Sequence, residues 1–549
     1  MPDQGTQGST GAPDAARTQL RGQGFAALKA GAWPQAADAG QLLLRANRQD
    51  SEGWLLVCLA LKGMNSVDTL KAFGQAMQSV PPSDAAYPLL ATEMANVLAS
   101  RGRADEAAAV ADRIAPDPRL TPRQRDVLSN AYAQAMLFEK ALEQADMAVS
   151  VLPDDPASLY SRGLAHRHLG HLDEAEADFE RVLQQDPLHG LTHFALADTR
   201  SWTDATAHID RLKAARAAPG PEPLDKARIC YALFKEAHDC KQTALAWDAL
   251  SECNRIAAEL NPDSQAERQA SASSMIATFT GNLPAGPART ADSVTPVFVI
   301  GLPRSGTTLV ERILSAHPDV TAMGETQFVQ TALREELGIR NSLQILSLDN
   351  PRLQTANWES IAANYLRRTA YLRGDTPYFT EKLPQNYAFV GALRTAFPHA
   401  RFVHVRRNPM DSLFGAYRIL FAAGSYAWSY TLDGLASAYR DYRRLTDHWR
   451  QELGSDFVEI TLETLIDNQD SEIRRLMTET GIGFDERCLS PHKADGGVST
   501  ASSVQVRRPI NRSGVGTWRR YADELAPLLR ALQADGFVDA DGEAIWPAR

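Results

Sequence analysis

The spacing of alanines and prolines in the first half of the chain constrains its fold more than any other feature. Ala107, Ala141 and Ala175 follow one another at intervals of 34 residues, and Pro153 and Pro187 are also 34 apart. Ala and Leu recur around them at helical spacing, with little clustering of β-branched residues. Small residues let two antiparallel helices approach closely, and a proline ends the second helix of a pair. The period therefore predicts a stack of helical pairs.

This period and pattern resemble the tetratricopeptide repeat, a two-helix unit that stacks into a superhelix. We expect such repeats over residues 20–280, most clearly over 20–190, after a disordered terminus at 1–19. Gly31 to Ala36 is typical of the turn in an earlier, weaker copy. The resemblance implies a protein or peptide partner on the concave surface of the array. A purely structural role for the repeats, or a non-repetitive helical bundle, is the alternative.

The composition of the 549-residue chain is that of a globular protein, with 44% hydrophobic and 23% charged residues. Its net charge of −10 argues against a dedicated nucleic-acid-binding protein, which would carry a basic face. The five scattered cysteines include no CxxC pair, so neither a disulfide framework nor a structural zinc site is expected. Because the sequence has no apolar stretch of membrane-spanning length and no signal-peptide pattern at its start, we expect a cytoplasmic protein without a membrane span.

The composition changes after residue 280. Residues 281–295 are rich in Gly, Pro, Ala and Thr, which predicts a linker. Val297 to Ile300 then form a β-branched and aromatic run typical of a buried strand, and GLPRSGTT at 301–308 leads into a helical pattern. The backbone N–H groups of such a loop and the N-terminus of the helix form an anion site suited to phosphate. We therefore predict an α/β domain over 296–549 that opens with a phosphate loop.

This loop differs from the ATP-binding phosphate loop, G-x-x-x-x-G-K-[ST], at one position. Gly301, Gly306 and Thr308 match that pattern, but Thr307 occupies the position of the lysine. The lysine that reaches the β- and γ-phosphates is therefore missing, which disfavours a kinase or an ATPase. Arg304 instead places a positively charged, planar guanidinium group inside the loop.

The strand, loop and helix with PRSGTT resemble the sulfotransferase family, whose co-substrate is 3′-phosphoadenosine 5′-phosphosulfate (PAPS). The resemblance implies a P-loop-like α/β domain with a mostly parallel sheet. Because the sulfuryl group carries less charge than a γ-phosphoryl group, no metal is expected. The loop residues that would hold the 5′-phosphosulfate are Arg304, Ser305, Gly306, Thr307 and Thr308.

A second segment that resembles this family follows the strand-like run at 400–405. Arg407 to Asp411 is similar to the family's 3′-phosphate-binding segment, and Arg407 would pair with that phosphate. The family usually has a serine eight positions after this arginine, where the present chain has Gly415. A neighbour such as Ser412 could supply the missing hydroxyl. If it does not, we expect Gly415→Ser to tighten nucleotide binding.

Three more segments resemble the branch that contains tyrosylprotein sulfotransferases and bacterial repeat-containing sulfotransferases. Gly324-Glu325-Thr326 is similar to the segment with that branch's catalytic glutamate, but Gln327 stands where its arginine is expected. Residues 381–386 are similar to the segment with the lysine that stabilises the transferring sulfuryl group, and residues 498–521 to the C-terminal cofactor loop. The resemblance thus implies two catalytic residues, Glu325 and Lys382, and three more cofactor contacts, Ser499, Ser502 and Arg508.

Together these segments imply transfer of a sulfuryl group from PAPS to an acceptor hydroxyl on a protein tyrosine, a glycan or a small phenol. Glu325 would act as the general base, and Lys382 and Arg304 would neutralise charge on the sulfuryl and 5′-phosphate oxygens. His317 and His404 are other candidates for the base, although we expect His404 to be a core residue of its strand. The alternative to an enzyme is a non-catalytic repeat scaffold with a nucleotide-binding domain.

Overall fold

The computed structural model describes residues 11–204, 206–281, 294–339, 350–421, 425–493 and 509–547. Nearly all of the predicted linker lies outside these ranges, and so do the predicted terminus up to residue 10 and the predicted contacts Ser499, Ser502 and Arg508. Packing divides the chain into two units, Met1–Ala165 and His166–Arg549. No helix in the described ranges combines the length and the apolar character needed to cross a membrane.

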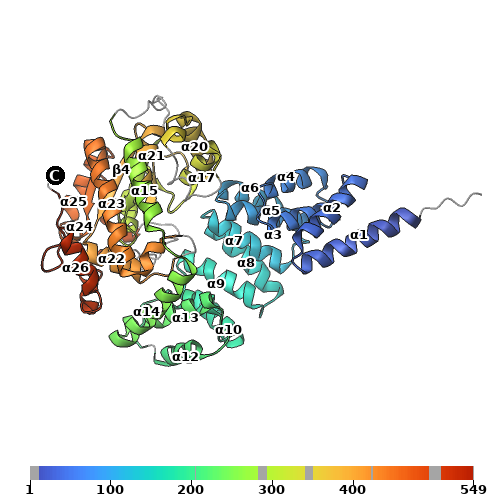
Figure 1. The fold of residues 1–549 in the computed structure, drawn as a ribbon, viewed down its shortest axis with the longest axis horizontal. Helices are drawn as coiled ribbons and strands as arrows, with labels where there is room; N and C mark the ends of the chain where they lie inside the picture. Colours follow the sequence, from blue (N-terminus) through green and yellow to red (C-terminus); the bar gives the residue numbers. More distant parts are fainter. Residues whose placement is uncertain are drawn as a thin grey trace, which may run out of the picture. The chain divides into compact units, whose positions relative to one another are not determined.

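The first unit is a succession of helices that pack against their neighbours along the chain (Figure 1). Short loops join them, as the repeat pattern predicts. The helices are α1 (Gly11–Lys29), α2 (Trp33–Ala46), α3 (Ser51–Gly63), α4 (Thr69–Ser79), α5 (Tyr87–Ser100), α6 (Ala104–Ile114), α7 (Pro122–Gln134), α8 (Phe138–Val151) and α9 (Pro156–Leu169), of which α9 extends past the boundary at Ala165.

The three alanines that define the period occupy equivalent places. Ala107, Ala141 and Ala175 are each the fourth residue of a helix, in α6, α8 and α10 (Leu172–Gln185), and each is fully buried. The earlier turn is also present, because Gly31 adopts a φ of 71° between α1 and α2. The prediction of repeated helical pairs is confirmed.

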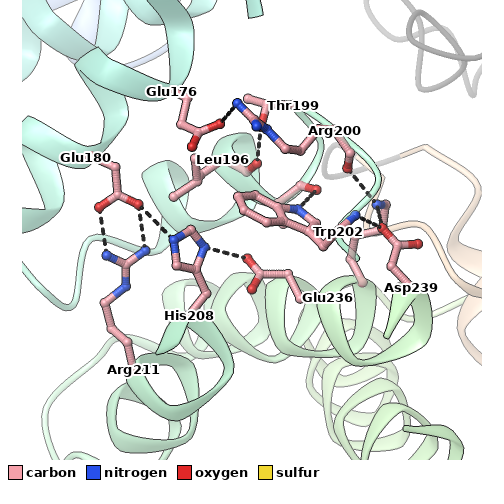
Figure 2. A network of polar contacts seen from close by, with 12 residues as sticks. Glu176, Glu180, Leu196, Thr199, Arg200, Trp202, His208, Arg211, Glu236 and Asp239 are labelled. Atoms are coloured by element: carbon pink, nitrogen blue, oxygen red, sulfur yellow. Dashed lines mark hydrogen bonds and ion pairs between the residues drawn. The ribbon is translucent and has the colours of Figure 1, made fainter. Parts of the chain in front are cut away.

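The helical pattern continues into the second unit, where the sequence period fades. After α10 follow α11 (Gly190–Ala197), α12 (Thr206–Ala217), α13 (Pro223–Asp239), α14 (Thr243–Leu260) and α15 (Gln265–Thr278). Figure 2 shows His208 of α12 between Glu180 of α10 and Glu236 of α13, at 3.4 and 3.7 Å. Arg211 donates to the same Glu180 carboxylate at 2.7 and 3.0 Å. A polar network therefore joins α10, the last helix that the period marks, to α12 and α13, which it does not mark.

The rest of the second unit is built on a five-stranded sheet with the order β2-β3-β1-β4-β5. The strands are β1 (Thr295–Gly301), β2 (Val320–Ala322), β3 (Tyr378–Glu381), β4 (Arg401–Arg406) and β5 (Phe457–Thr461). Every pair is parallel, with Gly301 opposite Val405 and Phe298 opposite Glu381. All seven residues of β1 are buried, as expected for the central strand of a sheet covered on both faces. The predicted α/β fold with a parallel sheet is confirmed.

Helices follow and cover these strands (Figure 1). They are α16 (Thr307–Ser315), α17 (Phe328–Leu337), α19 (Asn350–Gln354), α20 (Trp358–Arg373), α21 (Val390–Ala396), α22 (Pro409–Tyr417), α23 (Leu432–Leu453), α24 (Leu462–Asp467), α25 (Gln469–Glu479) and α26 (Ala526–Ala534). Two 3₁₀ segments bear on the site, η1 (Pro384–Phe389) and η7 (Thr517–Tyr521).

The helices of the second unit that precede residue 281 share a core with this sheet domain. Phe279, just after α15, is 1% exposed and packs edge-on against Trp358 and Trp449, with ring centroids 5.9 and 6.5 Å away. Arg268 of α15 donates to the Asp441 carboxylate of α23 at 3.1 Å. This packing explains why α10–α15 fall in the same unit as the sheet. The ranges 20–280 and 296–549, drawn from sequence pattern, remain a prediction about domains.

Candidate functional site

The strand order brings the predicted site residues to one edge of the sheet. Glu325 follows β2, Lys382 follows β3, the loop at 301–306 follows β1, and Arg407 follows β4. Because these four strands are parallel neighbours, their carboxyl ends lie at the same edge, where open α/β sheets bind ligands. The spatial order is therefore Glu325, Lys382, loop and Arg407, although the loop comes first in the sequence.

The backbone of the phosphate loop adopts left-handed φ angles at Arg304 and Gly306. Gly306 has a φ of 100° and immediately precedes α16, where a Cβ atom would lie 2.8 Å from Leu462. Arg304 also adopts a left-handed φ of 67°, which costs energy for a residue other than glycine and often marks a binding site. Ser305 is 1% exposed, and its Oγ finds no hydrogen-bond partner among the described residues. Thr307 and Thr308 begin α16 and are buried.

Three arginines gather beside the loop. The pKa of Arg304 falls to about 10 because of burial and because Arg418 and Arg407 repel its charge. Burial lowers the pKa of Arg407, and burial together with the Arg407 charge lowers that of Arg418. Buried like charges destabilise a fold unless counter-charges offset them. Asp411, 3.9 Å from Arg407, offsets part of this repulsion, and an anion beside the loop would offset more. Arg418 has no motif around it, and sequence reasoning missed it.

Arg407 joins the loop to the C-terminal segment. Its Nη1 donates to the Arg304 carbonyl oxygen at 2.6 Å and its Nη2 donates to that of Gly514. Asp411, four residues later, accepts a hydrogen bond from the Gly516 N–H at 2.6 Å, at the start of η7. The Arg407–Asp411 segment therefore holds the phosphate loop and the segment after residue 509 together.

The presence of glycine at position 415 has a steric explanation that the sequence did not reveal. A Cβ atom at this position would lie 2.8 Å from the Cβ and 3.2 Å from the Cγ of Arg304. A serine at 415 would therefore displace Arg304 before it could offer a hydroxyl, which argues against the expectation that Gly415→Ser tightens nucleotide binding. Ser412 is 1% exposed, and its Oγ has no hydrogen-bond partner within the described part of the chain.

Lys382 and Glu325 form an ion pair at the ends of β3 and β2. The Lys382 side chain is completely buried, whereas that of Glu325 is 33% exposed. The Lys382 N–H also donates to the Gly324 carbonyl oxygen at 3.0 Å, which ties the two turns together. The pair thus offers a buried cation and a carboxylate that reaches solvent, beside the loop.

Two further carboxyl groups lie behind this pair. Glu311 of α16 is 5% exposed and accepts hydrogen bonds from the Gly324 N–H and the Thr380 hydroxyl, both at 3.1 Å. Glu381 is 0% exposed and accepts from the Tyr365 hydroxyl at 2.7 Å. Burial raises the pKa of Glu381 to about 7. Sequence reasoning assigned neither residue a role, because an isolated glutamate on a helix or strand carries no signal of its contacts.

The raised pKa of Glu381 predicts a pH-dependent stability. The folded protein holds this proton more tightly than the unfolded chain, whose glutamate has an ordinary pKa of 4.5. The resulting stabilisation is fully present below that value and is lost as the pH rises through about 7, with a ceiling of about 3 kcal/mol. Glu381→Gln cannot ionise, so we expect its unfolding free energy to decline less between about pH 5 and pH 8. If the unfolding free energies of variant and parent decline equally between about pH 5 and pH 8, this assignment is contradicted.

The two histidines considered as bases are both buried and hydrogen-bonded. His404 is 2% exposed on β4, and its ring nitrogens lie 3.1 Å from a Glu459 oxygen and 2.5 Å from the Tyr442 hydroxyl. The expectation of a satisfied core histidine is confirmed. His317 is 8% exposed, and its Nδ1 accepts the Asp319 N–H at 3.1 Å. Across the described ranges, no three His, Cys, Asp or Glu side chains form a group that could hold a metal ion.

Comparisons with known proteins agree with this architecture. Residues 296–486 match the sulfotransferase family, and residues 128–219 match the tetratricopeptide repeat. A protein of Aquifex aeolicus (strain VF5), itself uncharacterised, is 29% identical over 412 residues, which cover 72% of this chain and 53% of that protein. The chain thus spans about half the length of this relative.

Two animal relatives match a little under half of the chain. Protein-tyrosine sulfotransferase 1 of Danio rerio is 24% identical over 256 residues, covering 44% of this chain and 72% of the relative. Protein-tyrosine sulfotransferase A of Caenorhabditis elegans is 23% identical over 269 residues, covering 44% and 67%. The chain therefore joins tetratricopeptide repeats to a domain of the sulfotransferase family.

Proposed function

We propose that this protein transfers a sulfuryl group from PAPS to an acceptor hydroxyl. The observation that carries the proposal is the buried Lys382 paired with the solvent-reaching Glu325, at the sheet edge that also holds the phosphate loop. A domain that only bound a nucleotide would have no use for a carboxylate in this place. A tyrosine hydroxyl is the first acceptor to try, because two relatives are named protein-tyrosine sulfotransferases. A glycan and a small phenol are the others.

The residues present fit PAPS as the donor. The Ser305 hydroxyl, which has no hydrogen-bond partner among the residues that the structure describes, and the N-terminus of α16 suit the 5′-phosphosulfate, together with Gly306, Thr307 and Thr308. The repulsion among Arg304, Arg407 and Arg418 would be relieved by the charges of a bisphosphorylated nucleotide. We assign Arg407 to the 3′-phosphate. Ser499, Ser502 and Arg508 remain proposed contacts of the same nucleotide.

Residues of this chain would then carry out different parts of the reaction. PAPS supplies the sulfuryl group, whose bond to the 5′-phosphate oxygen breaks as the bond to the acceptor oxygen forms, leaving 3′,5′-bisphosphoadenosine. Glu325 accepts the proton of the acceptor hydroxyl on its carboxylate as attack proceeds, a contribution of about a hundred- to ten-thousandfold. The Lys382 ammonium and the Arg304 guanidinium neutralise negative charge that builds on the sulfuryl and phosphate oxygens. No metal ion is needed for these roles.

The repeats would serve the same reaction by recruiting the acceptor. Tetratricopeptide arrays expose a concave face that binds peptides or proteins, and this favours a polypeptide carrier for the acceptor hydroxyl. We place the reaction in the cytoplasm, where free thiols persist, because all five cysteines are unpaired.

The direct test is incubation of the protein with ³⁵S-labelled PAPS and three acceptor classes, namely tyrosine-containing peptides, oligosaccharides and small phenols. Transfer of label to one class supports the proposal and identifies the acceptor. Nucleotide binding without transfer to any class would favour the non-catalytic scaffold. Labelling from γ-³²P-ATP in place of PAPS would favour a kinase.

Nucleotide selectivity gives a prediction that does not depend on the acceptor. We expect 3′,5′-bisphosphoadenosine to bind about tenfold to a hundredfold more tightly than AMP, because the 3′-phosphate adds a charge-assisted pair of about 1.5–3 kcal/mol with Arg407. Titration calorimetry measures both affinities, and magnesium chelation should leave them unchanged. Arg407→Lys should reduce the selectivity, whereas Arg401→Lys, at the far end of β4, should not. Equal affinities of the parent for both nucleotides would overturn the assignment of Arg407.

A further inference from the structure

A buried carboxyl group links the phosphate-loop helix to both residues of the proposed catalytic pair. Glu311 is the fifth residue of α16, the helix that begins directly after the loop, and it is 5% exposed. Its Oε1 accepts two hydrogen bonds of 3.1 Å, one from the Gly324 N–H and one from the Thr380 hydroxyl. Gly324 precedes Glu325, and Thr380 lies two residues before Lys382.

These contacts fix the turn that carries Glu325. Gly324 adopts a left-handed φ of 69°, so the chain bends sharply just before the carboxylate. Its N–H is held by Glu311, and its carbonyl oxygen is held by the Lys382 N–H at 3.0 Å. Both polar groups of this one residue are thus tied, one to the phosphate-loop helix and the other to the end of β3. A change at Glu311 would release the first of these ties.

The buried surroundings of Glu311 indicate that its carboxyl group does more than pack against its neighbours. An apolar residue would satisfy packing at a buried position, whereas a buried carboxyl group has a desolvation cost that must be offset. Burial raises the pKa of Glu311, and the nearby Lys382 charge and the two hydrogen bonds act against this rise. Glu325 and Glu381 are the other charged or titratable groups that face it.

We propose that Glu311 is a positioning residue, which holds the Gly324 turn so that Glu325 and Lys382 face the phosphate loop in the geometry needed for sulfuryl transfer. This inference rests on the proposed function. It predicts that Glu311 acts through its hydrogen-bond acceptor and not through its charge. A displacement of about 1 Å of a catalytic group can cost about a hundredfold in rate, so losing the acceptor should affect turnover strongly and nucleotide binding weakly.

Two substitutions in the full-length protein separate these effects. Glu311→Gln keeps an oxygen acceptor in the same place, and Glu311→Ala removes it. We expect kcat to fall about thirty- to a hundredfold in Glu311→Ala, and to stay within about threefold of the parent in Glu311→Gln. The affinity for 3′,5′-bisphosphoadenosine and the acceptor KM should stay within a few-fold in both variants. Asp441→Asn, at a buried carboxylate on α23 that pairs with Arg268, is the matched control and should leave kcat unchanged.

Amide hydrogen exchange over residues 320–327 provides a readout that does not depend on activity. Exchange should accelerate in Glu311→Ala but not in Glu311→Gln. Parental kcat in Glu311→Ala, an equal loss of kcat in both variants, or a parallel loss of kcat and nucleotide affinity would each overturn the inference. A parent that binds the nucleotide but transfers label to no acceptor would contradict the proposed function, and this inference with it.

Discussion

Replacing Glu325 with glutamine is expected to lower kcat for sulfuryl transfer by about a hundredfold or more. The substitution keeps the size and the hydrogen-bonding shape of the side chain, but an amide cannot take a proton from the acceptor. The affinity for 3′,5′-bisphosphoadenosine should change by only a few-fold, because the lost interaction belongs mainly to the transition state. Initial rates with labelled PAPS and calorimetry on the same preparation measure the two quantities.

The partner of Glu325 makes a control necessary. Lys382 is completely buried, and in Glu325→Gln it keeps Glu311 as a nearby carboxylate but loses its ion-pair partner. Some stability will therefore be lost, and thermal unfolding of the variant must accompany the kinetics. Glu359→Gln, at an exposed position on α20, is the matched substitution and should leave kcat unchanged. If Glu325→Gln turns over like the parent, the general base lies elsewhere.

The repeats show how far sequence pattern reaches. The spacing of Ala107, Ala141 and Ala175 predicts helical pairs because one buried small residue recurs in each unit. The pattern ends near Pro187, yet five further helices follow. Those helices pack through individual contacts, such as His208 with Glu236 and Phe279 with Trp449, which have no period. Periodicity therefore detects only the part of the array that is held together in the same way in every repeat.

The site was predictable where a motif lies at the end of a strand. The phosphate loop and Arg407 could be placed from sequence, because strand-like runs at 297–300 and 400–405 precede them. Glu325 and Lys382 could be placed only through the resemblance of their segments to a family. Their spatial order could not, since the insertion of β3 between β2 and β1 is decided by tertiary packing. Single charged residues outside motifs, such as Glu311 and Arg418, were missed for the same reason.

Gly415 shows a different limit. The sulfotransferase family that this segment resembles usually has a serine at this position, so Gly415 suggests one lost contact to the nucleotide. In the fold, the absent side chain makes room for the stem of Arg304, whose Cβ would lie 2.8 Å from a Cβ at 415. Positions 304 and 415 lie more than a hundred residues apart in the sequence. A single sequence therefore cannot reveal that the missing side chain at 415 makes room for Arg304.

Removing the helices before residue 294 is expected to destabilise the sheet domain severely. A fragment of residues 294–549 loses Phe279, which is 1% exposed and packs against Trp358 and Trp449. Removing a buried phenylalanine side chain alone costs about 3–5 kcal/mol, a large part of the 5–15 kcal/mol that a typical domain has. The fragment also loses the Asn254 side-chain hydrogen bond of 2.9 Å to the Tyr417 carbonyl oxygen, on the helix that follows Arg407.

A longer fragment supplies the contrast. Residues 166–549 retain α10–α15 and the sheet in one unit, so this fragment should unfold near the midpoint of the full chain in urea, while 294–549 unfolds far earlier or fails to fold. Phe279→Ala in the full chain should reproduce part of the loss, about 3–5 kcal/mol. If 294–549 matched 166–549 in stability and nucleotide affinity, residues 296–549 would be an autonomous domain, and the helices before it would serve only to select the acceptor. If it does not, α10–α15 are structural parts of the sheet domain, and any acceptor-recruiting function falls to the repeats before residue 166.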